Sequence, residues 1–355
     1  MSKAVRWRCR VAALVAAWSL AALAQAAGLA HWSPSSRAQI TAALDHAPAG
    51  AYAVFDADNT IWTNDLEEAL LPFLEQRGQL SPAMLDPALR PVPLLPGESL
   101  YGYYRRLCDI DDKLCYPWIA QVFAGRSLAE LKRDVDAMMA SPAPVPVRYQ
   151  EGGRPVSGTV RPPAIHPGQR ELIAALRAKG IHVYVVTAAA EELARMILSD
   201  SRYGLDIPPQ DVIGVTMLLR DPRDGSVTTA RRQIAQGHFL DALYPAERHG
   251  AMILTPTLWS PETWFEGKVA GIQAYIDPVR RPWLVAGDSR SDWSMLFYAA
   301  GLRIWVNHDP AATSALATTR GARAATEDAA GLHPPLGADQ GWLITTPALL
   351  DTGSN

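Results

Sequence analysis

Two aspartates separated by a single residue follow an apolar segment in the first third of the chain. Residues 53–62 read AVFDADNTIW, so Asp56 and Asp58 stand where a predicted buried strand ends. Two more aspartates, Asp288 and Asp292, follow the apolar run of PWLVAGDSRSD in the same way. Clustered carboxylates raise one another's pKa values unless a cation neutralises them. Mg²⁺ is a suitable cation, because it binds one or two carboxylates together with the oxygens of a substrate phosphate.

A hydroxyl group and a lysine complete a set that suits phosphoryl transfer. Thr187 ends the apolar segment IHVYVVT, and Lys268 lies near the start of a predicted helix in FEGKVAGIQAYI. A carboxylate can attack phosphorus to form an aspartyl-phosphate. A second carboxyl group can protonate the leaving alkoxide and then deprotonate the attacking water, while the lysine and the hydroxyl hold phosphoryl oxygens. These residue types predict a phosphomonoesterase, whose partner is a small-molecule phosphate monoester.

The segments that contain these residues alternate with predicted helices. We expect strands at residues 51–56, 181–187, 211–217, 282–287 and 302–307. Strands that are apolar throughout and alternate with helices indicate a parallel sheet covered by helices on both faces, which is a Rossmann-like α/β fold. Ligands bind such sheets at the carboxyl ends of the strands. The fold would therefore bring the aspartates, the threonine and the lysine to one edge.

Residues 62–160 interrupt this alternation between the first strand and the next. Amphipathic segments predict helices near residues 64–78, 98–109, 116–124 and 127–140. A hairpin that turns at Gly152-Gly153 follows them. We therefore predict a mainly helical cap domain at 62–160, inserted after the first strand, and a core domain at 27–61 and 161–355. Asn64 is the predicted N-cap of the first cap helix.

The N-terminal segment is typical of an export signal. Residues 1–26 combine four basic residues, an apolar stretch that is short for a transmembrane helix, and an A-x-A cleavage site that ends at Ala26. We expect a periplasmic or secreted protein without a stable membrane anchor after cleavage, and an uncleaved anchor is the alternative. The mildly acidic formal net charge of −3 argues against a nucleic-acid partner.

Two cysteines remain after the predicted cleavage site. Cys108 and Cys115 lie in LCDIDDKLCYPW. An even number of cysteines in an oxidising compartment favours a disulfide across this loop. The alternative is two unrelated buried thiols. A metal site is disfavoured, because neither His nor a further Cys lies nearby in the sequence to complete four ligands.

The order of the motifs resembles the haloacid dehalogenase superfamily of phosphatases. DADNT, VVTAA, Lys268 and GDSRSD stand in the order of the four motifs of that family. The resemblance implies that Asp56 is the nucleophile and Asp58 the acid/base. It implies a phosphate site at Asn59, Thr187, Ala188 and Lys268, and a Mg²⁺ site at Asp56, Asp288 and the backbone carbonyl of Asp58, supported by Ser289 and Asp292. Dehalogenases of the superfamily lack the second aspartate, so Asp58 favours phosphoryl chemistry. A catalytically inactive relative is the alternative.

The cap segment resembles a narrower group within the helical-cap branch that includes phosphoserine phosphatase. Exported phosphorylcholine phosphatases combine a signal peptide, a DxDNT motif, a Glu-Glu pair and a tyrosine-rich cap segment, which here are Glu67-Glu68 and YGYYRRLCDIDDKLCYPW. A quaternary ammonium cannot donate a hydrogen bond, so aromatic faces and a carboxylate hold it. The resemblance predicts a choline site formed by Glu68, Trp62, Tyr103, Tyr104, Tyr116 and Trp118.

Several alternatives stay open for the cap. Aromatic residues at helical spacing are often core residues, and Glu67 could complete a capping box with Asn64. Arg105 and Arg106 suit a carboxylated ester such as phosphoserine. A catalytically weak binding protein for choline-like solutes is a further alternative. The histidines lack metal-ligand spacing, and we expect them to be structural or exposed; they are His166, His182, His238, His249 and His308.

Overall fold

A mixed, mostly parallel sheet lies at the centre of the molecule. The computed structural model describes residues 28–141, 143–238 and 249–352, so the predicted signal peptide at 1–26 lies outside the described residues. The strand order is β12-β11-β10-β1-β6-β7-β8, and β9 also pairs with β7. The strands are β1 (Tyr52–Phe55), β6 (His182–Ala190), β7 (Val212–Arg220), β8 (Val227–Thr228), β9 (Ile253–Trp259), β10 (Leu284–Gly287), β11 (Leu302–Val306) and β12 (Trp342–Thr345).

The strand β1 lies between β10 and β6 and pairs with both in parallel. Ala53 is opposite Leu284 of β10 and Val183 of β6. All four β1 residues are buried, as expected for a strand with helices on both faces. The ladder continues past the strand, because the Asp56 backbone N–H donates to the Ala286 carbonyl at 2.9 Å. The carboxyl ends of β1, β6 and β10 therefore meet at one edge.

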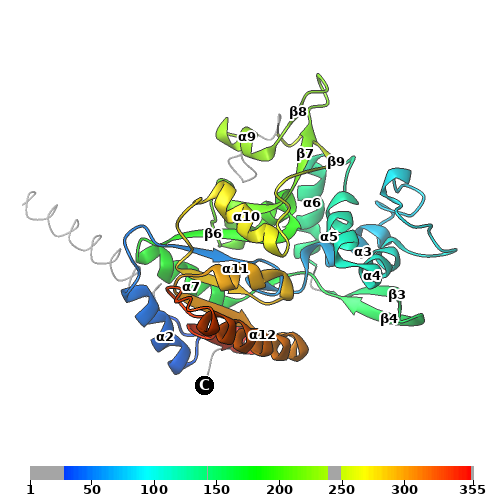
Figure 1. Cartoon of the computed structure of the whole chain (residues 1–355). Coiled ribbons are helices and arrows are strands. Elements are labelled where there is room, and N and C mark those ends of the chain that lie inside the picture. Colours follow the sequence, from blue (N-terminus) through cyan, green and yellow to red (C-terminus); the bar gives the residue numbers. More distant parts are fainter. Residues whose placement is uncertain (1–27, 142, 239–248, 353–355) are drawn as a thin grey trace, which may run out of the picture.

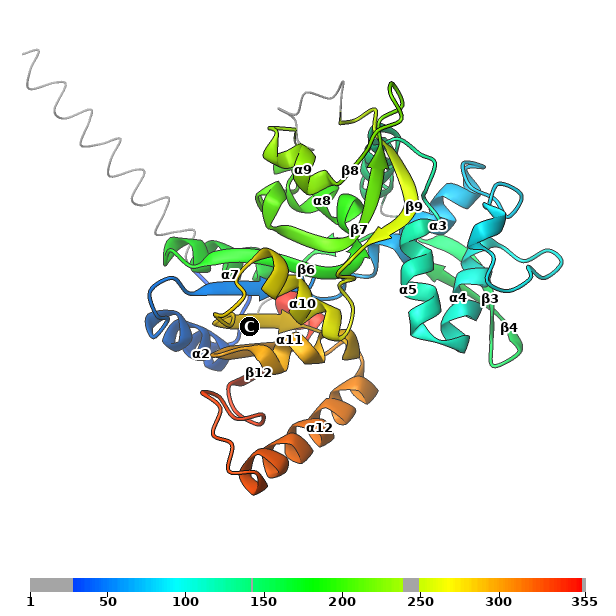
Figure 2. The same cartoon turned by 45° about the horizontal axis from the view of Figure 1, so that its top comes forward.

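Helices cover both faces of this sheet, which confirms the predicted Rossmann-like α/β fold (Figures 1 and 2). Alternate residues of β1 belong to different hydrophobic clusters. Ala53 and Phe55 pack in a cluster with residues of α2, α7 and α8, whereas Tyr52 and Val54 pack in one with residues of α10, α11 and α12. These helices are α2 (Pro34–Asp45), α7 (Pro167–Ala178), α8 (Glu191–Leu198), α10 (Glu266–Tyr275), α11 (Trp293–Tyr298) and α12 (Pro310–Ala329).

Two features of the sheet differ from the sequence-based expectation. The sheet is not entirely parallel. β8 pairs with β7 in antiparallel orientation around Asp224-Gly225, where the Asp-Gly sequence predicts a hairpin, but the antiparallel pairing of β9 with β7 was not predicted. The strand β12 pairs with β11 at the opposite end, and the sequence pattern did not reveal it. Its burial alternates instead of being continuous, which is the weaker pattern of an edge strand. The short helices α9 (Ala230–Ala235) and α13 (Pro347–Thr352) complete this part.

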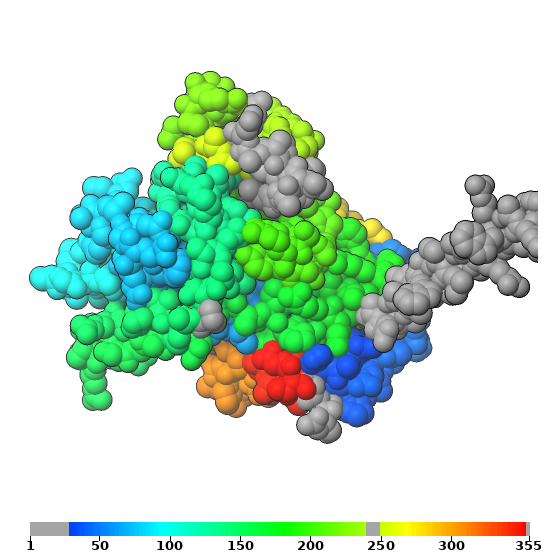
Figure 3. Space-filling model, turned by 180° about the vertical axis from the view of Figure 1, so that it is seen from behind, coloured from blue at the N-terminus to red at the C-terminus, as the bar shows by residue number. Residues whose placement is uncertain are grey.

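The segment between β1 and β6 forms a mainly helical lobe beside the sheet (Figures 1 and 3). Its elements are β2 (Trp62–Thr63), α3 (Leu66–Gln76), α4 (Leu100–Ile110), α5 (Asp112–Gln121), α6 (Leu128–Met139), the hairpin β3 (Val145–Glu151) with β4 (Arg154–Val160), and β5 (Ala164–Ile165). The entering and leaving segments pair with each other as the antiparallel ribbon β2–β5. The lobe also contacts the long β7–β9 extension, since the Leu128 N–H donates to the Met252 carbonyl at 3.0 Å.

The first helix of the lobe begins one residue later than predicted. Asp65, and not Asn64, is the N-cap of α3, and its carboxylate accepts hydrogen bonds from the Glu67 and Glu68 N–H groups. Asn64 has a positive φ of 66°, a conformation that asparagine adopts more readily than most residues. The capping-box interpretation of Glu67 is therefore wrong.

Among the described residues, we find no helix with the length and apolar character needed to cross a membrane.

The two cysteines of the lobe lie close together at the junction of α4 and α5. The sulfur atoms of Cys108 and Cys115 are within bonding distance, and their Cα atoms are 5.0 Å apart. A disulfide here would connect two consecutive helices that pack against each other. In the chain-entropy model, a disulfide that closes a loop of this length stabilises the folded state by roughly 2–3 kcal/mol.

We predict that the protein forms the Cys108–Cys115 disulfide in an oxidising compartment. Protein that is alkylated and digested without reductant should yield, in mass spectrometry, a peptide pair linked through these cysteines, and a reductant should separate it. Recovery of both cysteines in alkylated form would contradict the prediction.

Candidate active site

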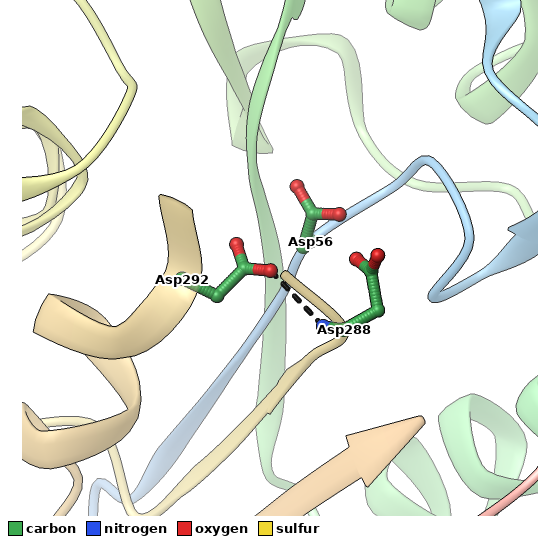
Figure 4. A group of neighbouring side chains, drawn as sticks. All are labelled: Asp56, Asp288 and Asp292. Atoms are coloured by element: carbon green, nitrogen blue, oxygen red, sulfur yellow. Dashed lines mark hydrogen bonds between the residues drawn. The ribbon is translucent and has the colours of Figure 1, made fainter. Parts of the chain in front are cut away.

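Three buried aspartates meet at the carboxyl edge of the sheet. Asp56 follows β1 and Asp288 follows β10, while Asp292 ends a short 3₁₀ turn before α11. One carboxylate oxygen from each lies within 4.8 Å of the others. Figure 4 shows the three side chains around one small space. The pairing of β1 with β10 places the first two side by side, as the sequence predicted.

Lys268 lies between two of these carboxylates. Its Nζ atom is 2.5 Å from Asp56 Oδ1 and 2.6 Å from Asp292 Oδ1, and the residue is 1% exposed. Burial acts to lower the pKa of Lys268, but attraction to Asp292 and Asp56 outweighs it and raises the pKa. Lys268 is therefore a cation at neutral pH. It offers charge-assisted hydrogen bonds within a buried site.

Asp292 holds the loop that contains Asp288. Its Oδ2 atom accepts hydrogen bonds from the backbone N–H groups of Asp288 at 3.0 Å and Ser289 at 2.9 Å, and from Ser289 Oγ. Figure 4 draws the first of these. A Cβ atom on Gly287 would lie 2.6 Å from the Asp292 Cβ, so only glycine permits this approach. The order Gly-Asp-x-x-x-Asp thus has a steric reason.

Two residues that the sequence did not indicate hold Asp288. Thr60 Oγ1 donates to Asp288 Oδ1 at 3.0 Å, and His308 Nε2 lies 2.7 Å from Asp288 Oδ2. Burial lowers the pKa of His308, which favours the neutral ring. The expectation that His308 is structural or exposed is incomplete, because it lines the cavity described below. Its position directly after β11 was the available signal, since that strand ends at the same edge.

The donor set of this cluster fits a hard divalent cation. Burial, and then the charge of Asp292, raises the pKa values of Asp56 and Asp288 well above their usual range. One lysine cannot offset three clustered carboxylates, whereas a divalent cation with oxygen ligands can. Asp56 and Asp288 line the cavity described below, whereas Asp292 does not. Asp56 and Asp288 are therefore the better candidate ligands, with Asp292 in support.

Asp58 lies at the boundary between the sheet and the lobe. Its Oδ1 atom accepts hydrogen bonds from Trp62 Nε1 at 2.7 Å and from the Leu66 N–H at 2.9 Å. Burial, and then the charge of Asp56, raises the pKa of Asp58 well above the usual range. A carboxyl group in this environment favours its protonated form, which is the form that a general acid requires.

The edge residues share a cavity of about 200 Å³ with the lobe. Thr187 and Ala188 from β6 line it together with Asn59 and Ser289. The Ala189 N–H donates to Thr187 Oγ1 at 3.1 Å, which orients the hydroxyl group. The structure thus brings the predicted phosphate-binding residues to one space. Aspartates 56, 58 and 288 and Lys268 also line this cavity.

Three of the predicted cap residues line the cavity from the lobe. They are Glu68, Tyr104 and Tyr116. The Tyr104 hydroxyl donates to Glu68 Oε1 at 3.0 Å, and the Tyr101 hydroxyl lies 3.5 Å from Glu68 Oε2. Asp65 and Ile119, which sequence reasoning missed, also line the cavity, as does Glu67, which it named in the Glu-Glu pair but not as a substrate ligand.

The other three predicted cap aromatics do not line the cavity. Trp62 is buried and donates its N–H to Asp58. Tyr103 donates to the Val92 carbonyl at 2.7 Å, and Trp118 donates to the Leu89 carbonyl at 2.8 Å. The polar groups of these three rings form hydrogen bonds within the protein. The rings therefore pack in the core, which was the alternative offered for aromatic residues at helical spacing. Trp118 stacks on Tyr104 with ring centroids 6.4 Å apart.

The two cap arginines do not line the cavity. Arg106 makes hydrogen bonds of 2.7 and 2.8 Å to the two carboxylate oxygens of Glu98. The guanidinium of Arg105 lies over the Tyr149 ring, 4.8 Å from its centroid, and its charge interacts with that of the cavity residue Glu68. Glu67, which was predicted as a possible capping residue, instead accepts a hydrogen bond from the Ala190 N–H at 3.1 Å.

Comparison with known proteins places this geometry in a family. The model of the haloacid dehalogenase-like hydrolases matches residues 53–242. A phosphorylcholine phosphatase from Pseudomonas aeruginosa is 45% identical over 346 residues, which cover 94% of this chain and 97% of that protein. The crystal structure of a conserved protein of unknown function from Anaerococcus prevotii shares the fold, with a TM-score of 0.56 and 16% identity over 82% of this chain and 90% of that chain. The chain therefore belongs to the haloacid dehalogenase-like hydrolase family, among its phosphoric monoester hydrolases.

Proposed function

We propose that this phosphatase hydrolyses phosphorylcholine, or a similar quaternary-ammonium phosphate ester, through an aspartyl-phosphate on Asp56. The observation that supports this most directly is the arrangement of one cavity. Its lining combines Asp56, Asp58, Thr187 and Lys268 from the core with Glu68 from the lobe. The 45% identical phosphorylcholine phosphatase supports the same substrate.

The first half of the proposed reaction transfers the phosphoryl group to the enzyme. The Asp56 carboxylate attacks phosphorus, the ester P–O bond breaks, and Asp58 gives its proton to the leaving alkoxide oxygen. Lys268 and the Thr187 hydroxyl bind the phosphoryl oxygens and offset the charge that develops on them. Both line the cavity beside Asp56.

The second half releases phosphate and restores the enzyme. Asp58, now a carboxylate, takes a proton from a water molecule whose oxygen attacks phosphorus, and the P–O bond to Asp56 breaks. Mg²⁺, held by Asp56, Asp288 and the Asp58 carbonyl, would neutralise the clustered carboxylates and the phosphoryl charge. Thr60 and His308 keep Asp288 in place through their hydrogen bonds.

The lobe side of the cavity suits a cation without N–H groups. Glu68 supplies a carboxylate, and Tyr104 and Tyr116 supply aromatic surface. A trimethylammonium group is held by such surfaces and by a nearby carboxylate. Phosphoserine, the runner-up substrate, would need a cation for its carboxylate. Arg105 and Arg106 do not line the cavity, so this side favours the choline ester.

We also propose that the protein acts after export, because its first 26 residues have the pattern of a cleaved signal peptide. A phosphatase outside the cytosol would meet small phosphate esters in the periplasm or the medium.

We predict that Asp56→Asn lowers kcat for phosphorylcholine at least about 10³-fold, because it removes the nucleophile. The amide oxygen can still accept a hydrogen bond from Lys268, so circular dichroism should show an unchanged fold. Near wild-type turnover by this variant would contradict the aspartyl-phosphate mechanism and favour a noncatalytic role for the cluster.

Metal binding can be measured without turnover. Excess Mg²⁺ added to chelator-treated protein should raise its Tm by about 2–4 °C, since a ligand that binds the folded state stabilises it. Asp288→Asn should abolish this shift. Asp45→Asn, which removes an exposed carboxylate paired with Lys179, should retain it. An equal shift in the Asp288 variant would place the metal elsewhere.

Substrate selectivity gives a third prediction. Glu68→Gln should raise KM for phosphorylcholine about five- to thirtyfold, because a cavity carboxylate near the cation is lost. It should leave KM for p-nitrophenyl phosphate, which has no cation, nearly unchanged.

The matched control is Glu98→Gln, which removes a cap carboxylate that pairs with Arg106 outside the cavity. It should leave both KM values unchanged. If phosphoserine proved the better substrate, and Arg105→Ala or Arg106→Ala impaired it selectively, the choline assignment would be wrong.

A further inference from the structure

Trp62 makes a direct contact with the proposed acid/base. Its side chain is fully buried, and its indole Nε1 donates to Asp58 Oδ1 over 2.7 Å. Trp62 does not line the catalytic cavity. Its influence on the reaction must therefore act through Asp58.

The backbone fixes this tryptophan close to the aspartate. Trp62 pairs with Ile165 in the β2–β5 ribbon, which joins the two connections between sheet and lobe. An isolated bridge also links Asp58 with Trp62, and the His166 N–H donates to the Ile61 carbonyl at 3.0 Å. A buried ring on a paired backbone has little freedom to rotate. The indole N–H is thus a pre-organised donor.

A second donor, from the first helix of the lobe, reaches the same oxygen. The backbone N–H of Leu66, the first residue of α3, lies 2.9 Å from Asp58 Oδ1. Within the described part of the chain, both hydrogen bonds of this carboxyl group end on Oδ1. Two donors on one oxygen restrain rotation of the carboxyl group. The other oxygen, Oδ2, remains for the exchange of a proton in the cavity, which Asp58 lines.

We propose that Trp62 is a positioning residue for general acid catalysis, and that its indole N–H holds Asp58 so that Oδ2 donates the proton to the leaving oxygen. This inference rests on the proposed function. In the step concerned, Asp56 forms a bond to phosphorus, the ester P–O bond breaks, and the proton on Asp58 Oδ2 moves to the leaving oxygen. Misplacement of Oδ2 by a fraction of an ångström weakens this transfer but leaves the nucleophile intact.

The leaving group supplies a readout that loss of stability cannot imitate. p-Nitrophenolate leaves readily as an anion and needs little protonation, whereas phenolate and the alkoxide of choline are stronger bases and depend on the acid. Phenyl phosphate and p-nitrophenyl phosphate both lack a cation, so the cap carboxylates affect them alike. The ratio of their kcat/KM values therefore isolates proton donation in the first half-reaction.

Trp62→Phe should lower kcat/KM for phenyl phosphate and for phosphorylcholine about ten- to hundredfold. For p-nitrophenyl phosphate the decrease should stay within about threefold. The matched control is Trp32→Phe, because Trp32 is also buried and donates its Nε1–H over 2.7 Å, to the Gly168 carbonyl, and neither residue lines the cavity. This control should change the three kcat/KM values by a common factor, if at all.

Equal losses for all three esters in Trp62→Phe, or no loss, would overturn the proposal, as would the same selectivity in the Trp32 control. If Trp62→Phe does not fold, benzothienylalanine at position 62 keeps the ring shape, replaces the N–H by sulfur, and should give the same selectivity.

Asp58→Asn separates this inference from the function on which it rests. That variant should discriminate between the two aryl esters more strongly than Trp62→Phe. If it treats both alike, the acid role of Asp58 fails and the proposed mechanism with it. If Asp58→Asn discriminates and Trp62→Phe does not, only the role of Trp62 is wrong.

Discussion

The buried contact of Lys268 with Asp56 and Asp292 is the interaction on which the site depends. It joins the end of β1, the first turn of α10 and the loop after β10 through bonds of 2.5 and 2.6 Å. Removal of one partner from a buried ion pair costs roughly 3–5 kcal/mol, because the remaining charge stays without water or a counter-ion. The cluster therefore depends on the presence of all three partners, and in the proposed reaction the lysine offers a cationic surface to the phosphoryl group. Repulsion among the three carboxylates is only partly relieved by it, which leaves a place for a divalent ion.

Sheet register converts distant sequence positions into this cluster. β1 has β10 on one side and β6 on the other, so Asp56 and Asp288, which follow their strands, lie near Thr187, which is in the C-terminal half of β6. The chain inserts its mainly helical lobe directly after β1, and the ribbon β2–β5 brings it back to the same edge. The lobe therefore closes over the residues that follow the strands, and its first helix supplies Glu68 to the cavity.

The sequence predicted the parts whose signal is local. Continuous apolar runs identified β1, β6, β7, β10 and β11, and the residues that follow them identified Asp56, Thr187 and Asp288. The sequence could not predict which cap aromatics line the cavity, because the spacing of residues along a helix does not say which side of the helix borders the cavity. Tyr104 and Trp118 stack on each other, yet only Tyr104 faces the cavity. His308 was missed because its relation to Asp288 depends on the order of strands in the sheet.

The boundary between lobe and sheet combines two tasks that could have been separate. Glu68 lies in the first turn of α3, and Leu66, two residues earlier, gives its N–H to Asp58. The helix that carries the proposed cation-binding carboxylate thus also holds the proposed acid/base. Trp62 adds a donor from the ribbon that anchors this helix to the sheet. A displacement of α3 relative to β1 would lengthen the Leu66 bond at the same time as it moved Glu68. The position of the lobe relative to the sheet and the position of the proposed acid therefore depend on each other.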